Sequence, residues 1–350
     1  MPIATIAIDL AKDVFELAAA DETGKIVERR RLSRLQLERY FENRRQVHVV
    51  MEACGTAHYW ARKFGERDMR VSLLPPHYVR AYARRNKTDT ADATALLEAA
   101  RASDITPVQV KSVVQQGLQG LHRVRTAWRA TRTARINMLR GLCREFGIAA
   151  PVGAKRGVTE LRRQLAEERS VVPAPLRAAL RQVLTELEGI DRHLAEIEGQ
   201  LADIASHSTT CQRLMSIPGI GLITSTAFAG AIGNIGAFRS SRRFASWLGL
   251  TPREHSSGNT RHLGAISKRG DGYLRMLLVH GGRAVLRSAD AAARAGRPLD
   301  ALRNWGLRVR ARNGHNKAAV AVANKLARIV WASWRHEQVF EFRLPRVVPA

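Results

Sequence analysis

Four acidic residues occupy positions from which their carboxylates could meet. Asp9 ends a short apolar run at residues 3–8, and Glu52 ends another at residues 47–51. Asp89 and Asp92 are three residues apart, so they share one face of any helix that contains them. Converging carboxylates repel one another unless divalent cations are bound between them, and such oxygen ligands suit Mg²⁺ or Mn²⁺. Two such ions can stabilise the attacking and leaving oxygens of a phosphodiester, which is the chemistry that this set indicates.

Each acid taken singly also has a structural explanation. Asp9 could end a strand and cap the next segment, and Asp89 could cap its own helix, a position where aspartate is common. Glu52 directly after an apolar strand is harder to explain as an ordinary surface residue. The four positions together are therefore more specific for a metal site than any one of them.

A short loop near the C-terminal end offers a nucleophile. Ser256 and Ser257 stand directly before Gly258, and a set of cationic side chains follows: Arg261, His262, Lys268 and Arg269. A hydroxyl among cations can be activated for attack on phosphorus, because the cations stabilise both the alkoxide and the charge of the phosphorane. A Ser-Ser-Gly sequence is ordinarily just a turn, so the residues alone leave both roles open.

The acids need a sheet and a helix to position them. Short apolar segments predict strands at residues 3–8, 14–20, 25–31, 47–51 and 70–74, with a helix at 58–66 and helical periodicity after Asp89. This order is the one expected of an RNase-H-like α/β domain. In that topology the first and fourth strands are neighbours, and a helix packs across their ends.

The middle of the chain reads as two long helices. Residues 112–146 carry apolar side chains at helical spacing and an arginine-rich remainder that could bind a nucleic-acid backbone: Arg123, Arg125, Arg129, Arg132 and Arg135. A Gly- and Pro-rich segment at 151–175 is expected to be a loop with one short helix. Residues 176–204 repeat apolar residues in steps of four and three, which predicts a coiled coil with either the helix at 112–146 or a second protomer. An ordinary amphipathic helix is the alternative.

The last part of the chain, from residue 207, reads as helical and punctuated by glycine. Its segment Ser216 to Gly221 resembles half of a helix-hairpin-helix, in which the amides of Gly219 and Gly221 could hold a DNA phosphate. A plain turn between helices would look the same. We therefore divide the chain into an α/β domain at 1–107, a basic helix with a coiled-coil dimerisation region at 108–206, and a mainly helical domain at 207–350.

The composition favours a polyanionic partner. Lys and Arg number 57 against 31 Asp and Glu, for a net charge of +26, and a field of this size attracts nucleic acid. There is no apolar run of about 18 residues that could span a membrane, and no signal peptide. The three cysteines form no CxxC pair, so the sequence indicates neither a zinc site nor a disulfide framework.

The motifs together resemble the DEDD transposases of insertion sequences. The matching segments are 8–14 (IDLAKDV), 51–55 (MEACG), 86–93 (NKTDTADA), 217–221 (IPGIG) and the stretch 244–275. They span nearly the whole chain in the order of the family, and no motif acid departs from the family pattern.

The resemblance implies a specific mechanism. It gives Asp9, Glu52, Asp89 and Asp92 the four acid positions of a RuvC-like domain, and it makes the C-terminal part a transposase domain whose serine forms a phosphoserine link with DNA. The matching serine is Ser257, with Ser256 as the alternative. The resemblance also implies homodimers that join into a tetramer, a site shared between protomers, and a bridge RNA that pairs with donor and target DNA. We find no clear base-reading helix, as expected where a guide RNA reads the sequence.

Two other functions fit the same residues. A RuvC-like Holliday-junction nuclease would cleave with metal-activated water and use Ser257 only structurally, and a non-enzymatic DNA- or RNA-binding regulator would not need the acids. Under any of the three, we expect a cytoplasmic, nucleoid-associated bacterial protein that contacts no membrane.

Overall fold

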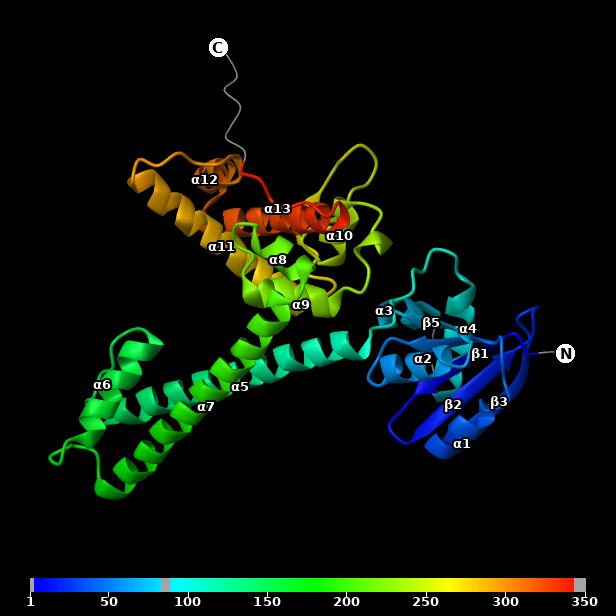
Figure 1. Ribbon diagram of the computed structural model, residues 1–350, viewed down its shortest axis with the longest axis horizontal. Coiled ribbons are helices and arrows are strands. Elements are labelled where there is room, and N and C mark those ends of the chain that lie inside the picture. Colours follow the sequence, from blue (N-terminus) through cyan, green and yellow to red (C-terminus); the bar gives the residue numbers. More distant parts are fainter. Residues whose placement is uncertain (1–2, 83–88, 343–350) are drawn as a thin grey trace, which may run out of the picture. The chain divides into compact units, whose positions relative to one another are not determined.

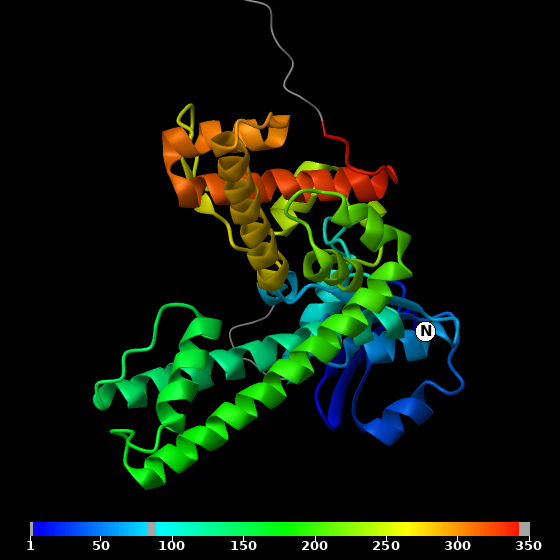
Figure 2. The same ribbon diagram turned by 60° about the vertical axis from the view of Figure 1, so that its left-hand side comes forward.

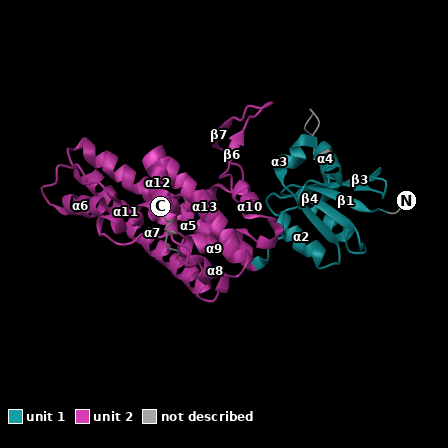
Figure 3. Ribbon diagram, turned by 90° about the horizontal axis from the view of Figure 1, so that it is seen from above, with its two compact units in different colours: residues 1–113 teal, residues 114–350 magenta. Residues whose placement is uncertain are grey.

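The computed structural model describes residues 3–82 and 89–342, and for residues 89 and 90 it describes the backbone alone. The chain divides into two compact units, an N-terminal unit at Met1–Val113 and a C-terminal unit at Val114–Ala350, which are coloured separately in Figure 3. The division into three domains expected from the sequence remains a prediction.

The N-terminal unit is built on a five-stranded mixed sheet with strand order β3-β2-β1-β4-β5 (Figure 1). β1 pairs antiparallel with β2 and parallel with β4. The strands are β1 (Thr5–Leu10), β2 (Val14–Ala20), β3 (Ile26–Ser33), β4 (His48–Glu52) and β5 (Arg70–Leu74). Five strands were expected at these places, so the prediction of an α/β unit is confirmed, and the strand order is consistent with an RNase-H-like domain.

Helices cover both faces of this sheet. Ile6, Ile8 and Met51 face a core that contains Trp60 and Phe64 of α2. The opposite face is lined by small side chains such as Ala7 and Ala18, which belong to the same buried cluster as α4. The helices of the unit are α1 (Arg34–Tyr40), α2 (Ala57–Gly65), α3 (Pro76–Val79), η1 (Arg80–Tyr82) and α4 (Asp89–Arg101).

Three helices form an extended arm of the C-terminal unit: α5 (Val113–Glu145), α6 (Ala154–Ala166) and α7 (Ala174–Ser206). α5 and α7 run side by side in both views (Figure 1, Figure 2). The partners Arg125 with Glu198 and Arg135 with Glu186 show that the two helices are antiparallel. Leu180, Leu187 and Ile190 of the heptad pattern are buried in one cluster with α5. Of the two partners left open by the sequence, the structure shows the helix of the same chain, so these apolar residues are not available to a second protomer while this packing holds.

The rest of the C-terminal unit is a helical body around α13. Ala319, Val322, Ala323 and Leu326 of α13 are fully buried, and α11 packs closely against this helix. The sequence predicted helices here but not the exposed hairpin of β6 and β7. The elements are α8 (Thr209–Met215), α9 (Leu222–Ala231), η2 (Ile235–Ala237), α10 (Ser241–Trp247), β6 (Pro252–Glu254), β7 (Leu263–Ile266), α11 (Gly272–Arg294), α12 (Ala301–Asn313) and α13 (His315–Arg335). Across the residues that the model describes, we find no helix both long and apolar enough to cross a membrane.

A buried histidine joins α5, α9 and α11. The Nε2 of His122 lies 3.1 Å from the hydroxyl of Thr226, and its Nδ1 lies 3.1 Å from the hydroxyl of Tyr273. Thr226 donates its own proton to the carbonyl of Leu222 at 2.7 Å, so it accepts from Nε2. His122 therefore carries its proton on Nε2 and accepts from Tyr273 at Nδ1. Burial, helped by the charge of Arg125, lowers the pKa of His122 to about 4.

Because the pKa of His122 is lowered, we expect the folded chain to lose stability in mild acid. The unfolded chain binds a proton at His122 near pH 6.5 and the folded chain only near pH 4, so folding stability is complete above pH 6.5 and declines as the pH falls toward 4. The decline is at most roughly 3 kcal/mol. Urea denaturation of the full chain at a series of pH values gives the free energy of unfolding. This free energy should depend less steeply on pH in His122→Gln than in the wild type. His207→Gln, which alters an exposed histidine, should leave the dependence unchanged; equal slopes in all three proteins would contradict the assignment.

Candidate active site

Asp9 and Glu52 lie at the same end and on the same face of the sheet. Ile8 of β1 is paired with Met51 of β4 in the parallel ladder, and the two acids are the next residues of their strands. Because successive side chains of a strand alternate between faces, both acids point away from the core that holds Ile8 and Met51. They point to the face covered by α4, and both are half-buried.

The two charges act on a common neighbour. Burial raises the pKa of the Cys54 thiol, although part of this residue is exposed to solvent, and the negative charges of Glu52 and Asp9 raise it further. A single thiol feels both carboxylates only if both are close to it. The structure thus brings Asp9 and Glu52 together, as the sequence predicted.

Glu16 is a further acid on this face that the sequence analysis missed. It is paired with Asp9 across the antiparallel ladder of β1 and β2, so the two side chains point to the same side of the sheet. Glu16 lies 3.5 Å from Arg31, which supplies an opposite charge. Only the register of the two strands could have revealed it, since nothing marks Glu16 in the sequence.

The beginning of α4 lies at the same end of the sheet as the two acids. The guanidinium of Arg101, at the end of α4, is close to Gly24, which follows β2 beside the start of β1. Thr94 accepts a hydrogen bond from Arg29 at 3.0 Å near the middle of the sheet. α4 therefore runs opposite to β1, and its first turn lies toward Asp9.

Asp92 lies in that first turn. It is half-buried, and it precedes the buried residues Ala95 and Leu96 by three and four positions, so it lies on the face of α4 that packs on the sheet. Asp89 begins the helix, but its side chain lies outside the described residues.

The acids fit a divalent metal by type and by location. Asp9, Glu52 and Asp92 supply the oxygen ligands that Mg²⁺ and Mn²⁺ prefer, and they share one end and one face of the sheet. Within the part of the chain that the model describes, no three His, Cys, Asp or Glu side chains are close enough to form a metal centre. The donor set is thus suitable, while the described side chains do not form a preformed cage.

The two candidate serines lie at the tip of the hairpin of β6 and β7. Residues 252–265 are all exposed. Ser257 and Thr260 pair through both of their backbone hydrogen bonds, at 3.2 and 3.1 Å, so Gly258 and Asn259 form a two-residue turn. Gly258 has a φ of +55°, a backbone conformation that favours glycine at this place in a hairpin turn.

The hydroxyls of the two serines have different surroundings. Ser256 donates to the carboxylate of Glu254 at 2.9 Å and accepts from the amide of His262 at 3.3 Å. The hydrogen bond from Ser256, followed by that from Arg261, lowers the pKa of Glu254. The side chain of Ser257 has no hydrogen bond within residues 3–82 and 89–342.

The arginines of α5 fall into two groups. Arg125, Arg132 and Arg135 form ion pairs at 2.5 to 2.7 Å with Glu198, Asp191 and Glu186 of α7. These three were expected to bind nucleic acid, but their charges are already matched by carboxylates of the same chain, so the structure does not support that role for them. Arg123 and Arg129 are exposed and have no ion pair among the described residues.

Of the remaining basic candidates, Arg261 lies in the hairpin, and Lys268 and Arg269 follow its second strand. Arg261 contacts Glu254 at 3.1 Å, and its side chain remains mostly exposed. Lys268 and Arg269 are exposed in the turn between β7 and α11. These three cations remain accessible to phosphates.

Gly219 is explained by packing. It has a φ of +85°, and a Cβ at this position would lie 2.6 Å from the carbonyl oxygen of Gly281 in α11. Gly221 is exposed and precedes α9, whose first turn has no side-chain cap. Packing explains the conformation of Gly219, and the phosphate contact expected at Gly219 and Gly221 stays a prediction.

Two models of transposase families match separate parts of the chain. A family model described as "Transposase IS116/IS110/IS902 family" matches residues 211–296, and a model of DEDD transposases of the IS110 type, described as "Transposase", matches residues 6–147. The first region contains the serine hairpin and the second contains all four acids.

Relatives match over almost the full length. A probable family 20 transposase of Pseudomonas aeruginosa is 41% identical, with 97% of this chain and 99% of the relative covered. The transposase for insertion sequence element IS1111A of Coxiella burnetii is 38% identical, with coverages of 97% and 91%. The transposase for IS1328 of Yersinia enterocolitica is 35% identical, with coverages of 97% and 99%. The resemblance noted in the sequence is thereby confirmed, and the chain belongs to the IS116/IS110/IS902 family of insertion-sequence transposases.

Proposed function

We propose that this transposase cleaves and rejoins DNA through a covalent bond between Ser257 and a DNA phosphate. The observation that carries the proposal is the difference between the two serines: the hydroxyl of Ser256 is held by Glu254, whereas that of Ser257 has no partner among the described residues and lies at an exposed hairpin tip. A nucleophile must approach phosphorus closely, and an exposed tip permits this approach. Arg261, which follows the turn at the hairpin tip, would stabilise the charge that develops, and Lys268 and Arg269 after β7 would contact the DNA backbone.

The chemistry is a pair of transesterifications. The Oγ of Ser257 forms a bond to phosphorus as the ester bond to one deoxyribose oxygen breaks, and that oxygen takes up a proton. A hydroxyl of the recipient strand then attacks the same phosphorus and releases Ser257 with its proton restored. One phosphate ester replaces another in each step, so rejoining needs no external energy source.

The four acids complete the proposed site. Members of the DEDD family generally depend on a divalent metal. Asp9, Glu52, Asp89 and Asp92 would hold Mg²⁺ or Mn²⁺, which when bound stabilises negative charge on phosphate oxygens. The acids and the serine belong to different compact units of the chain. We propose that the serine of one protomer meets the acids of another, in a tetramer assembled from dimers.

A guide RNA completes the proposal. The net charge of +26 is what remains after every Asp and Glu has been counted, including those paired with α5, and this supports a second polyanion beside the donor and target DNA. We propose that a bridge RNA supplies the sequence recognition by base pairing, so that the protein contacts mainly the backbone.

Replacing the serine tests the covalent step. Ser257→Ala should abolish the protein–DNA adduct that denaturing gel electrophoresis detects after incubation with element DNA and its flanking RNA, because the bond-forming oxygen is missing. Ser256→Ala removes only a hydrogen bond within the hairpin and should reduce adduct formation by less than about tenfold.

The same experiment separates the alternative enzyme. If Ser257→Ala still cleaves DNA and no adduct forms with the wild type, the protein acts as a RuvC-like hydrolytic nuclease and the serine proposal is wrong. An adduct that survives in Ser257→Ala but not in Ser256→Ala would move the nucleophile to Ser256.

Replacing the acids tests the metal site. Asp9→Asn and Glu52→Gln keep the size of each side chain but remove a charged ligand, so adduct formation should fall by at least about 100-fold. Binding of Mn²⁺, followed by electron paramagnetic resonance, should weaken in the same variants. Glu22→Gln, in the exposed turn between β2 and β3, should behave as the wild type. Unchanged adduct formation in Asp9→Asn would mean that the reaction does not use these acids.

A further inference from the structure

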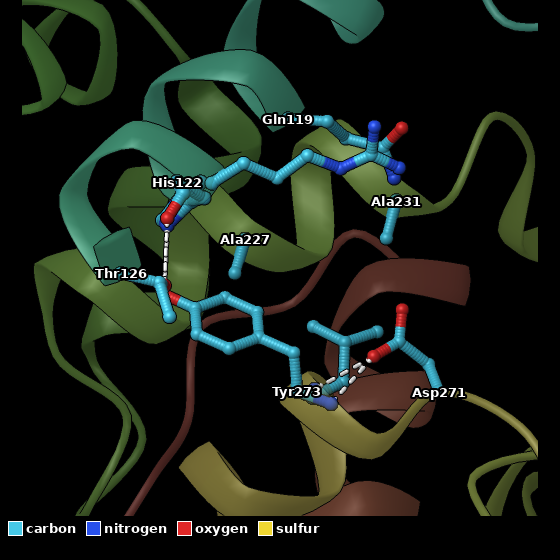
Figure 4. Close-up of a pocket in the computed structure, with 9 residues that line it drawn as sticks. Gln119, His122, Thr126, Ala227, Ala231, Asp271 and Tyr273 are labelled. Carbon is cyan, nitrogen blue, oxygen red and sulfur yellow. Dashed lines mark hydrogen bonds between the residues drawn. The ribbon is translucent and has the colours of Figure 1, made fainter. Parts of the chain in front are cut away.

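The C-terminal unit contains a cavity that the proposed chemistry does not use. It has a volume of about 370 Å³ and lies between α5, α9 and the start of α11 (Figure 4). Ligand pockets range from about 300 to 1,000 Å³, so this one suits a single small group rather than a duplex. Its lining residues are Gln119, His122, Arg123, Thr126, Ala227, Ala231, Asp271, Tyr273 and Leu274.

One wall of the cavity is a fixed aromatic ring. The hydroxyl of Tyr273 donates to Nδ1 of the neutral His122, which is held in turn by Thr226. The His122 ring is nearly fully buried. A ring anchored in this way loses little freedom when a flat ligand stacks on it, which favours binding.

The facing wall is apolar and small. Ala227 and Ala231 of α9 carry single methyl groups, and Figure 4 shows Ala227 near the edge of the Tyr273 ring. Larger side chains at these two positions would fill the space. The cavity therefore offers a gap beside an aromatic ring, which is the shape that an unpaired nucleobase occupies.

Polar side chains that line the cavity can pair with the hydrogen-bonding groups of a base. Asp271 accepts from the amides of Tyr273 and Leu274 through Oδ1, at 2.8 and 3.0 Å. Its Oδ2 has no hydrogen bond in the described part of the chain, so it can accept from a ring N–H. Gln119 offers an amide that can donate to a carbonyl. Thymine and uracil carry both of these groups.

Arg123 supplies a positive charge at the cavity. It lines the cavity, it is exposed, and it has no ion pair within the described residues, unlike Arg125, which pairs with Glu198 of α7. A guanidinium at the edge of a base-sized cavity is suited to bind the phosphate of the nucleotide whose base lies inside.

We infer that this cavity binds one unpaired pyrimidine nucleotide of a nucleic acid strand, with its base on Tyr273 and its phosphate on Arg123. The inference rests on the action of the family on nucleic acid and is independent of Ser257 and of the acids. A site of this kind would hold a strand in register beside the helical body while another segment reacts.

Photo-cross-linking of the full chain tests this site. The probes are short oligothymidylate and oligouridylate strands that contain 5-iodouracil, and the modified peptides are identified by mass spectrometry. Both arms use Ser257→Ala protein, so the cross-linking result does not depend on whether Ser257 forms a covalent bond with DNA. We expect cross-links on the peptide that contains Tyr273, and the stronger arm identifies DNA or RNA as the source of the nucleotide.

Variants define the cavity as the binding site. Ala231→Trp fills the space, so the cross-link yield on the Tyr273 peptide should fall by roughly 5- to 150-fold, the range that base–aromatic stacking covers. Tyr273→Leu also removes the cross-linking ring, so its affinity for the same strands is measured by fluorescence anisotropy and should fall by a similar factor. Ala293→Trp, at an exposed position of the same helix as Tyr273, is the matched control and should retain the full yield. Arg123→Gln alters an exposed side chain, so it keeps the test informative if Ala231→Trp lowers the unfolding temperature.

Two results would overturn the inference. One is the absence of any cross-link at Tyr273 in both arms. The other is a yield in Ala231→Trp and Arg123→Gln equal to that of the control, because the strand would then bind elsewhere.

Discussion

The parallel pairing of β1 with β4 is the constraint on which the candidate site depends. Ile8 and Met51 are partners in that ladder and are buried on one face, so the next residues, Asp9 and Glu52, must emerge together on the other. A slip of one residue in either strand would send one acid into the apolar core. The burial of apolar neighbours thus fixes the register, and the register brings the two charges together.

Much of this could be predicted because the signals are local. Apolar runs marked the five strands, and the acids followed from their ends. α1 was missed, although Ser33 and Gln36 form a capping box that the sequence already contained. β6 and β7 were missed for a physical reason: every residue from 252 to 265 is exposed, so no apolar periodicity marks the hairpin.

Charge pairing between distant segments could not be predicted from the sequence. The sequence predicted that the arginines of α5 bind nucleic acid, yet Arg125, Arg132 and Arg135 meet carboxylates more than fifty residues away in α7. The heptad pattern predicted a packed helix but not its partner, since α5 and a second protomer offer similar apolar surfaces. The base-sized cavity was equally invisible, because it arises where α5, α9 and α11 meet.

The hairpin that carries Ser257 has a consequence for the timing of the reaction. A two-stranded hairpin without a covering layer is only marginally stable in water, so its tip is not held rigidly in the unassembled protein. Under the proposed mechanism, the oxygen of Ser257 would gain a defined trajectory only when substrate or a neighbouring subunit closes around it. Breakage of chromosomal strands by a solitary molecule would then be discouraged, and cleavage would wait until the proposed assembly has formed.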